Sequence, residues 1–152
     1  MSVISAGAEV PEFKLLTAEG EPFTRADLLG RTSLLIFYPF AFSGGCTNQL
    51  TTYEAALDEF HARGLSLYAI STDARQSQAA FKEKVGSSID QLSDFEPKGA
   101  AAEAFGARHS GGMTTRAVVI VGSDGLVRWS EEKTNLFEFP TPAEILAALD
   151  AS

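Results

Sequence analysis

The hydrophobic and polar residues of the chain fall into blocks whose lengths predict alternating strands and helices. The longest apolar block lies at residues 33–38, where Leu-Leu-Ile-Phe-Tyr follows a serine, and Pro39 ends it. A continuous apolar run of this length is typical of a central strand that is covered on both faces. Apolar blocks at 65–71 and 117–121 predict two further strands.

Helical spacing fills the segments between and after these strands. Four apolar residues after the first strand recur at intervals of three and four, which places them on one face of a helix: Leu50, Tyr53, Leu57 and Phe60. Gly64 then lies where a glycine commonly ends a helix. We expect further helices at 73–85 and, with a proline near its start, at 97–105. Residues 141–144, Thr-Pro-Ala-Glu, form a capping box that predicts a C-terminal helix.

Turn residues predict an antiparallel hairpin near each end of this pattern. Glu-Gly-Glu-Pro at 19–22 follows the apolar segment 13–16, and Ser-Asp-Gly precedes an apolar segment at 126–130. With a short strand at 89–92, the order of elements implies a mixed α/β sheet with helices on both faces. This order resembles the thioredoxin fold, here with an N-terminal β-hairpin extension. Because 152 residues is close to the usual size of one domain, we expect residues 1–152 to form a single domain.

Composition and charge narrow the possible functions. Apolar residues make up 45% and charged residues 21% of the chain, which is ordinary globular composition. The formal net charge of −8 argues against binding to nucleic acid or to anionic membranes, because both need a basic surface. Residues 1–10 lack the basic region and the apolar stretch of a secretory signal. One cysteine cannot form an internal disulfide, so we expect a reducing, cytoplasmic location.

Cys46 is the only cysteine and the first candidate for chemistry. It lies at the expected start of a helix, where unpaired N–H groups and the helix dipole stabilise the reactive thiolate. A lone cysteine is more often a buried packing residue, so its neighbours decide. Ser43 places a hydroxyl three residues earlier, where it also fits as an N-cap, and Pro39 is suited to exclude water. Gly44 and Gly45 let backbone N–H groups approach a small ligand.

The spacing Pro39-x-x-x-Ser43-x-x-Cys46 resembles the peroxidatic motif of the peroxiredoxins. Two later segments resemble the same family: Leu-Ser-Asp-Phe at 92–95, and Thr-Arg-Ala-Val-Val-Ile-Val at 115–121 before an Asp-Gly turn. The likeness extends over nearly the whole chain and is nearest to the one-cysteine, AhpE-like group. It implies a thiol-dependent peroxidase that reduces H2O2 or small organic hydroperoxides through a cysteine sulfenic acid.

The resemblance assigns a role to each matching residue. Cys46 is the implied nucleophile, Ser43 the hydroxyl that hydrogen-bonds the peroxide, and Pro39 the shield of the sulfur. Arg116 is implied to hold the thiolate and the peroxide oxygens, since a fixed cation stabilises charge that moves from sulfur to the leaving oxygen. Gln49 departs from the pattern, because many members have glutamate there. Its amide accepts a hydrogen bond but carries no charge, so Arg116 is either held less firmly or less compensated in charge.

Partners and alternatives follow from the same residues. Without a second cysteine, an external thiol must complete the cycle: thioredoxin, a glutaredoxin-like protein or a low-molecular-weight thiol. The resemblance also suggests a homodimer, to which Phe40 and Phe42 are candidates to contribute. We expect no cofactor and no metal site, because His61 and His109 are far in sequence from each other and from Cys46. The alternatives are a peroxide-sensing redox adaptor with the same fold and a non-redox thioredoxin-fold binding module.

Overall fold

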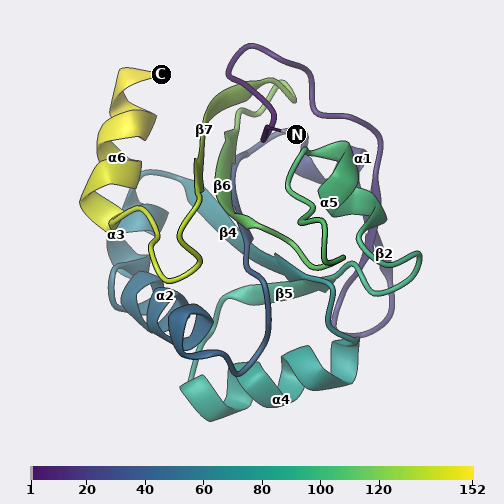
Figure 1. The fold of residues 1–152 in the computed structure, drawn as a ribbon. Helices are drawn as coiled ribbons and strands as arrows, with labels where there is room; N and C mark the ends of the chain where they lie inside the picture. The colour runs from purple at the N-terminus through teal and green to yellow at the C-terminus, as the bar shows by residue number, and fades with distance from the viewer. Residues whose placement is uncertain (1) are drawn as a thin grey trace.

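A computed structural model describes residues 2–152, and within that range seven strands form one mixed sheet (Figure 1). The strand order across the sheet is β2-β1-β5-β4-β3-β6-β7. In chain order the strands are β1 (Lys14–Leu16), β2 (Pro22–Thr24), β3 (Thr32–Phe37), β4 (Leu65–Ser71), β5 (Asp90–Ser93), β6 (Arg116–Val121) and β7 (Val127–Lys133). The helices are α1 (Arg25–Leu28), α2 (Gly44–Ala55), α3 (Leu57–Ala62), α4 (Arg75–Val85), α5 (Ala100–Ala104) and α6 (Pro142–Ala151).

Parallel strands form the centre of the sheet and antiparallel pairs form its two sides. β4 lies parallel to both β3 and β5, whereas β6 runs antiparallel to β3 and to β7. All of β6 is buried, and so is every residue of β3 after Thr32. The burial of β3 confirms the prediction, made from its continuous apolar run, of a strand that is covered on both faces, and β6 is buried in the same way.

Helices cover both faces of the sheet (Figure 1). Residues of α2, α3, α4 and α6 share one apolar core with the sheet, and residues of α1 and α5 share the other. Successive residues of β3 alternate between these cores, with Leu34 and Ile36 facing the α2 side and Leu35 and Phe37 the opposite side. Cys46 lies in the core on the α2 side. The candidate site is therefore built between α2 and the central strands.

The single helix predicted from about Cys46 to Gly64 is divided in two. Ala56 adopts φ −102° and ψ 7°, which ends α2 and begins α3. Apolar spacing did not indicate the break because Phe60, beyond it, still faces the same core. The helix also begins earlier than predicted, because α2 starts at Gly44 and therefore includes both Gly44 and Gly45.

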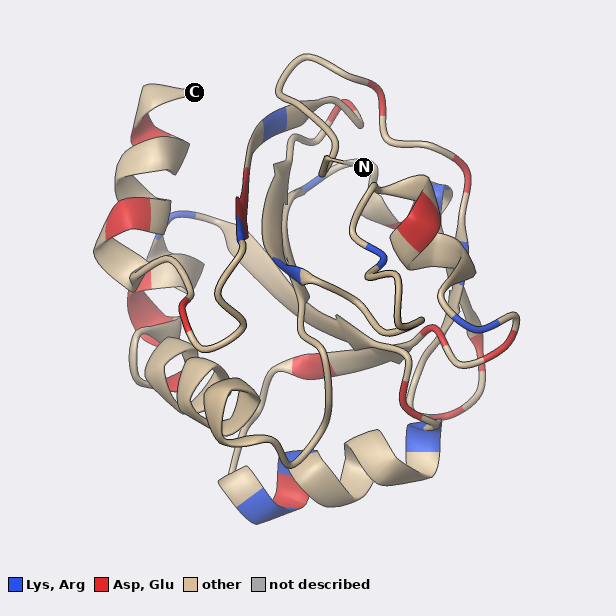
Figure 2. Ribbon diagram, viewed as in Figure 1, with Lys and Arg blue, Asp and Glu red and all other residues tan. Residues whose placement is uncertain are grey.

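Charged residues lie mainly on the helices and loops, and the central strands carry few (Figure 2). β3 and β4 contain no charged residue, and the single charged residue of β6 is its first one, Arg116. That arginine is 2% exposed. Charged side chains are almost never fully buried unless they have a partner, so the burial of Arg116 indicates that this residue has a specific role. None of the helices within residues 2–152 is long and apolar enough to cross a membrane.

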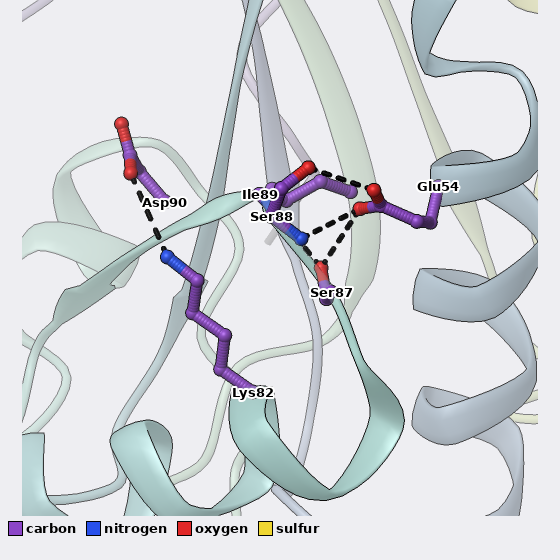
Figure 3. Close-up of polar contacts among 6 residues, drawn as sticks. All are labelled: Glu54, Lys82, Ser87, Ser88, Ile89 and Asp90. Atoms are coloured by element: carbon purple, nitrogen blue, oxygen red, sulfur yellow. Dashed lines mark hydrogen bonds and ion pairs between the residues drawn. The ribbon is translucent and has the colours of Figure 1, made fainter.

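Glu54 fastens the C-terminal half of α2 to the turn that precedes β5 (Figure 3). Its carboxylate accepts hydrogen bonds from the Ser88 N–H at 2.8 Å and from the hydroxyls of Ser88 at 2.7 Å and Ser87 at 3.2 Å. Burial raises the pKa of Glu54, but these hydrogen bonds outweigh it and the net pKa is lowered. On the other side of the turn, Lys82 pairs with Asp90 at 3.8 Å. The Glu54 contacts tie α2, the helix that carries Cys46, to this turn, whereas the Lys82–Asp90 pair joins α4 to β5.

Candidate active site

Cys46 occupies the first turn of α2, and Ser43 is the N-cap of that helix. The Cys46 N–H donates to the Ser43 Oγ at 3.2 Å, and the Thr47 N–H donates to the Ser43 carbonyl oxygen at 2.9 Å. The hydroxyl of Ser43 thus acts as an acceptor toward the helix and still has its own proton to donate. Both functions expected for Ser43, cap and ligand donor, are compatible with this geometry.

The thiol of Cys46 is enclosed. The residue has 0% exposure and packs among the apolar side chains of the α2 core, including Ile36, Tyr38 and Leu50. Pro39, two residues after the end of β3, is also buried. The burial expected of a lone cysteine is therefore present, and it occurs at a helix N-terminus, where a thiolate is stabilised.

Arg116 reaches the start of α2 from β6. Its Nη1 donates to the Gln49 Oε1 at 2.7 Å, and its Nε and Nη2 donate to the Leu136 carbonyl oxygen at 2.9 and 2.6 Å. Both partners are neutral, and within residues 2–152 no carboxylate forms an ion pair with this arginine. A buried cation without a counter-ion is costly, so the site favours an anion beside it. A thiolate and the oxygen that leaves a peroxide are anions of this kind.

Gln49 continues a chain of buried hydrogen bonds away from the arginine. Its Nε2 donates to the Tyr53 hydroxyl oxygen at 3.3 Å, and that hydroxyl donates to the Pro140 carbonyl oxygen at 2.7 Å. Burial raises the pKa of Tyr53, so its hydroxyl keeps the proton that it donates. Glutamine suits this position because its amide accepts from Arg116 and donates to Tyr53, which an ionised glutamate does not do. Arg116 is thus firmly held while its charge stays uncompensated.

Gly45 is required by the close approach of Arg116. A Cβ atom on Gly45 would lie 2.9 Å from the Arg116 Nη2 and 3.2 Å from the Leu136 carbonyl oxygen. The sequence predicts that this glycine lets backbone N–H groups approach a ligand. The structure adds a different reason, namely that the guanidinium and the 134–140 loop pack directly on the first turn of α2.

We predict that Gly45→Ala displaces the guanidinium and lowers the second-order rate constant for peroxide reduction by about ten- to a hundredfold, because misplacement of a charged group by about 1 Å is enough for such a loss. Gly44→Ala is the matched control, since nothing lies within 4 Å of a Cβ atom there. Stopped-flow kinetics of both variants checks the prediction. Equal rate constants for the two would contradict it.

Several residues of the site were not found from the sequence. Leu136 and Pro140 contribute only carbonyl oxygens, for which a sequence contains no signal. Tyr53 was placed correctly on the buried face of its helix, and the need of a buried tyrosine hydroxyl for a partner was the available clue. Thr114, fully buried, donates through its hydroxyl to the Tyr38 carbonyl oxygen and so fixes the chain just before Pro39.

The fold and the site together define a peroxiredoxin-like protein with one cysteine. Comparison with known proteins agrees, since the AhpC/TSA family matches residues 6–130. A Mycobacterium tuberculosis protein whose name assigns it to the peroxiredoxins is 31% identical over 129 residues, which is 82% of each chain. Alkyl hydroperoxide reductase E of the same organism is 29% identical over 133 residues, or 86% of this chain and 87% of the relative. The chain belongs to the AhpC/TSA family of peroxiredoxins.

Solved structures give the same result for the fold. Peroxidoxin BcpB from Mycobacterium tuberculosis superposes with a TM-score of 0.81 at 28% identity, covering 97% of this chain and 95% of its own. Enterococcus faecalis AhpC superposes with a TM-score of 0.85 at 24% identity, covering 99% and 92%. The protein is a thiol-dependent peroxidase of the one-cysteine type, with a thioredoxin-like fold.

Proposed function

We propose that Cys46 is the peroxidatic nucleophile and that H2O2 or a small organic hydroperoxide is its substrate. The observation that carries this proposal is a buried arginine without a counter-ion beside the helix N-terminus that holds the only thiol. Ser43 has a hydroxyl proton to offer the peroxide, and Pro39 excludes water. Arg116 supplies the positive charge. The enclosed position of Cys46 favours a small substrate over a bulky one.

The first step is an in-line displacement at the O–O bond. The Cys46 thiolate attacks one oxygen of ROOH, so an S–O bond forms as the O–O bond breaks. Sulfur is oxidised to a sulfenic acid, and the leaving oxygen takes up a proton to become water or an alcohol. Negative charge moves from sulfur to the leaving oxygen during this step, and the N–H groups of Arg116 that are not used by Gln49 and Leu136 stabilise it. The hydroxyl of Ser43 donates to the same oxygens.

An external thiol completes the cycle. It attacks the sulfur of the sulfenic acid, releases water and forms a mixed disulfide, and a second thiol then regenerates Cys46. Thioredoxin, a glutaredoxin-like protein and a low-molecular-weight thiol are the candidate reductants. Because Cys46 is fully buried in this arrangement, the reductant requires a displacement of the 39–43 loop or of the first turn of α2.

The assembly and location of the protein belong to the same proposal. We place it in the cytoplasm as one domain spanning residues 1–152, and we expect a homodimer. Phe40 and Phe42, in the loop before Cys46, are 47% and 50% exposed, and Phe137 beside Gly45 is 77% exposed. Burial of such aromatic side chains against a second copy would stabilise the pair.

The chemical step is tested by trapping its product. Treatment of the reduced protein with one equivalent of H2O2 is expected to add one oxygen atom to Cys46, in a form that reacts with dimedone. Mass spectrometry of the intact protein and of its peptides detects both changes. Recovery of an unmodified thiol after the peroxide has been consumed would count against a sulfenic acid intermediate.

A further inference from the structure

The loop that joins β3 to α2 contains an unfavourable backbone conformation. Phe42 has a φ of 70° and is the one non-glycine residue with positive φ among residues 2–152. Side chains other than glycine rarely adopt this conformation, and it persists where the surroundings hold it. Phe42 immediately precedes Ser43, the N-cap that accepts from the Cys46 N–H. Whatever holds Phe42 therefore also sets the position of Ser43.

Asp73 makes the side-chain contact that fixes this loop. Its Oδ2 accepts the Ala41 N–H at 2.8 Å, one residue before Phe42. Asp73 lies in the connection between β4 and α4, far from the loop in sequence. The ring of Phe42 packs against Phe81 of α4 with 5.2 Å between ring centroids. The loop is thus anchored to the β4–α4 region at Ala41 and through the ring of the strained residue itself.

The carboxylate of Asp73 is itself held in place. The Ser71 hydroxyl donates to its Oδ2 at 2.8 Å, and the Gln78 Nε2 donates to the Ser71 Oγ at 3.0 Å. The Ser93 hydroxyl donates to the Asp73 carbonyl oxygen at 2.6 Å. Ser71, Gln78 and Ser93 are all at least nine-tenths buried. Such a network presents the acceptor to Ala41 before any substrate binds.

We propose that Asp73 is a positioning residue of the peroxidase site, whose carboxylate holds the Ala41 N–H and thereby keeps Ser43 and Cys46 in the enclosed arrangement that reacts with peroxide. This inference rests on the roles proposed above for Ser43 and Cys46. Asp73 makes no hydrogen bond to either residue, so it acts only through the loop. Removal of its oxygen acceptor frees the loop, which disorders the donors around the peroxide and exposes the thiol.

Two assays with opposite expected directions test the role of Asp73. Asp73→Ala is expected to lower the second-order rate constant for H2O2 reduction about tenfold or more, as expected for loss of a hydrogen bond to a charged group. It is expected to raise the rate of Cys46 alkylation by iodoacetamide in the absence of peroxide, because the thiol becomes accessible. A loss of thiol reactivity would instead lower both rates. Unfolding would also expose the buried thiol, so both assays are made on variants that thermal unfolding shows to be folded.

Asp73→Asn is the conservative variant, because its amide oxygen still accepts from Ala41, and it is expected to stay close to the wild-type protein in both assays. Asp90→Ala removes an exposed carboxylate paired only with Lys82 and is expected to change neither rate. Thermal unfolding identifies any variant that fails to fold. Ser71→Ala, which removes one support of the carboxylate, then serves in place of Asp73→Ala and shifts both rates in the same directions by less.

Three results overturn the proposal: unchanged rates in folded Asp73→Ala, a fall in both rates, or an Asp73→Asn protein that behaves like Asp73→Ala. A wild-type protein that does not reduce peroxide would refute the proposed function instead. The alkylation assay would still report whether Asp73 holds the loop, because it does not depend on peroxide. The two failures are therefore distinguishable.

Discussion

Replacement of Arg116 by methionine is expected to lower the second-order rate constant for H2O2 reduction by about a thousandfold, because a single preorganised donor at a developing oxyanion is worth about a hundred- to a thousandfold. Arg116 supplies both a full charge and donors in a buried site, where electrostatic interactions are stronger than in water. Its position depends on three hydrogen bonds to Gln49 and Leu136, which methionine does not form. Stopped-flow kinetics of the reduced protein measures the change.

Two further variants serve as controls for Arg116→Met: Arg116→Lys, and Arg128→Met at an exposed arginine. Lysine keeps the charge but has no planar fork to bond Gln49 and Leu136 at once, so we expect a loss smaller than that of methionine. Arg128→Met, on β7, removes an exposed side chain paired with Asp124 and is expected to leave the rate constant unchanged. A folded Arg116→Met protein with the wild-type rate constant would show that the arginine has no part in the reaction.

The side chain of Gln49 is neutral, so it leaves the positive charge of Arg116 without a counter-ion. With glutamate there, a carboxylate would neutralise the guanidinium before substrate arrives. Gln49 instead accepts a hydrogen bond from Arg116 at 2.7 Å and leaves its charge uncompensated, as the role proposed for Arg116 toward the thiolate and the leaving oxygen requires. Of the two outcomes considered for this departure from the family, the contacts favour weaker charge compensation over looser placement.

The sheet could be predicted from the sequence because its central strands are buried on both faces. The runs that became β3 and β6 are continuous in apolar residues, and burial of both faces leaves no alternation there. β4 is also mainly apolar, although Ser66 and Tyr68 in its first half are only partly buried. The division between α2 and α3 at Ala56 could not be predicted. A local change of backbone angles leaves the spacing of Leu50, Tyr53 and Phe60 intact.

The site was predictable only as far as it is local in sequence. Ser43 and Cys46 are three residues apart, so helix geometry alone places them together. Arg116 was found through resemblance, because no local rule brings a residue of β6 to the start of α2. The contact of Asp73 with Ala41 depends on how the loops that follow the parallel strands β3 and β4 pack against each other. That meeting is a property of tertiary structure.

Cys46→Ser is expected to abolish peroxide reduction, down to the rate of the uncatalysed reaction. A serine hydroxyl is not ionised at neutral pH and oxygen is a weaker nucleophile than sulfur, so no attack on the O–O bond occurs. Serine occupies nearly the same volume in the enclosed position, and thermal unfolding is expected to show a folded protein. Loss of peroxide from solution is followed directly, so that the variant needs no reductant.

Rapid mixing of the reduced wild-type protein with H2O2, beside Cys46→Ser, tests the central claim most directly. We predict a second-order rate constant far above that of a free low-molecular-weight thiol at the same pH, and no reaction in the variant. A high rate constant also separates a peroxidase from a slowly oxidised redox sensor or a non-redox binding module. A wild-type rate constant no greater than that of the free thiol, or equal rates in the two proteins, would contradict the assignment of Cys46 as an activated peroxidatic nucleophile.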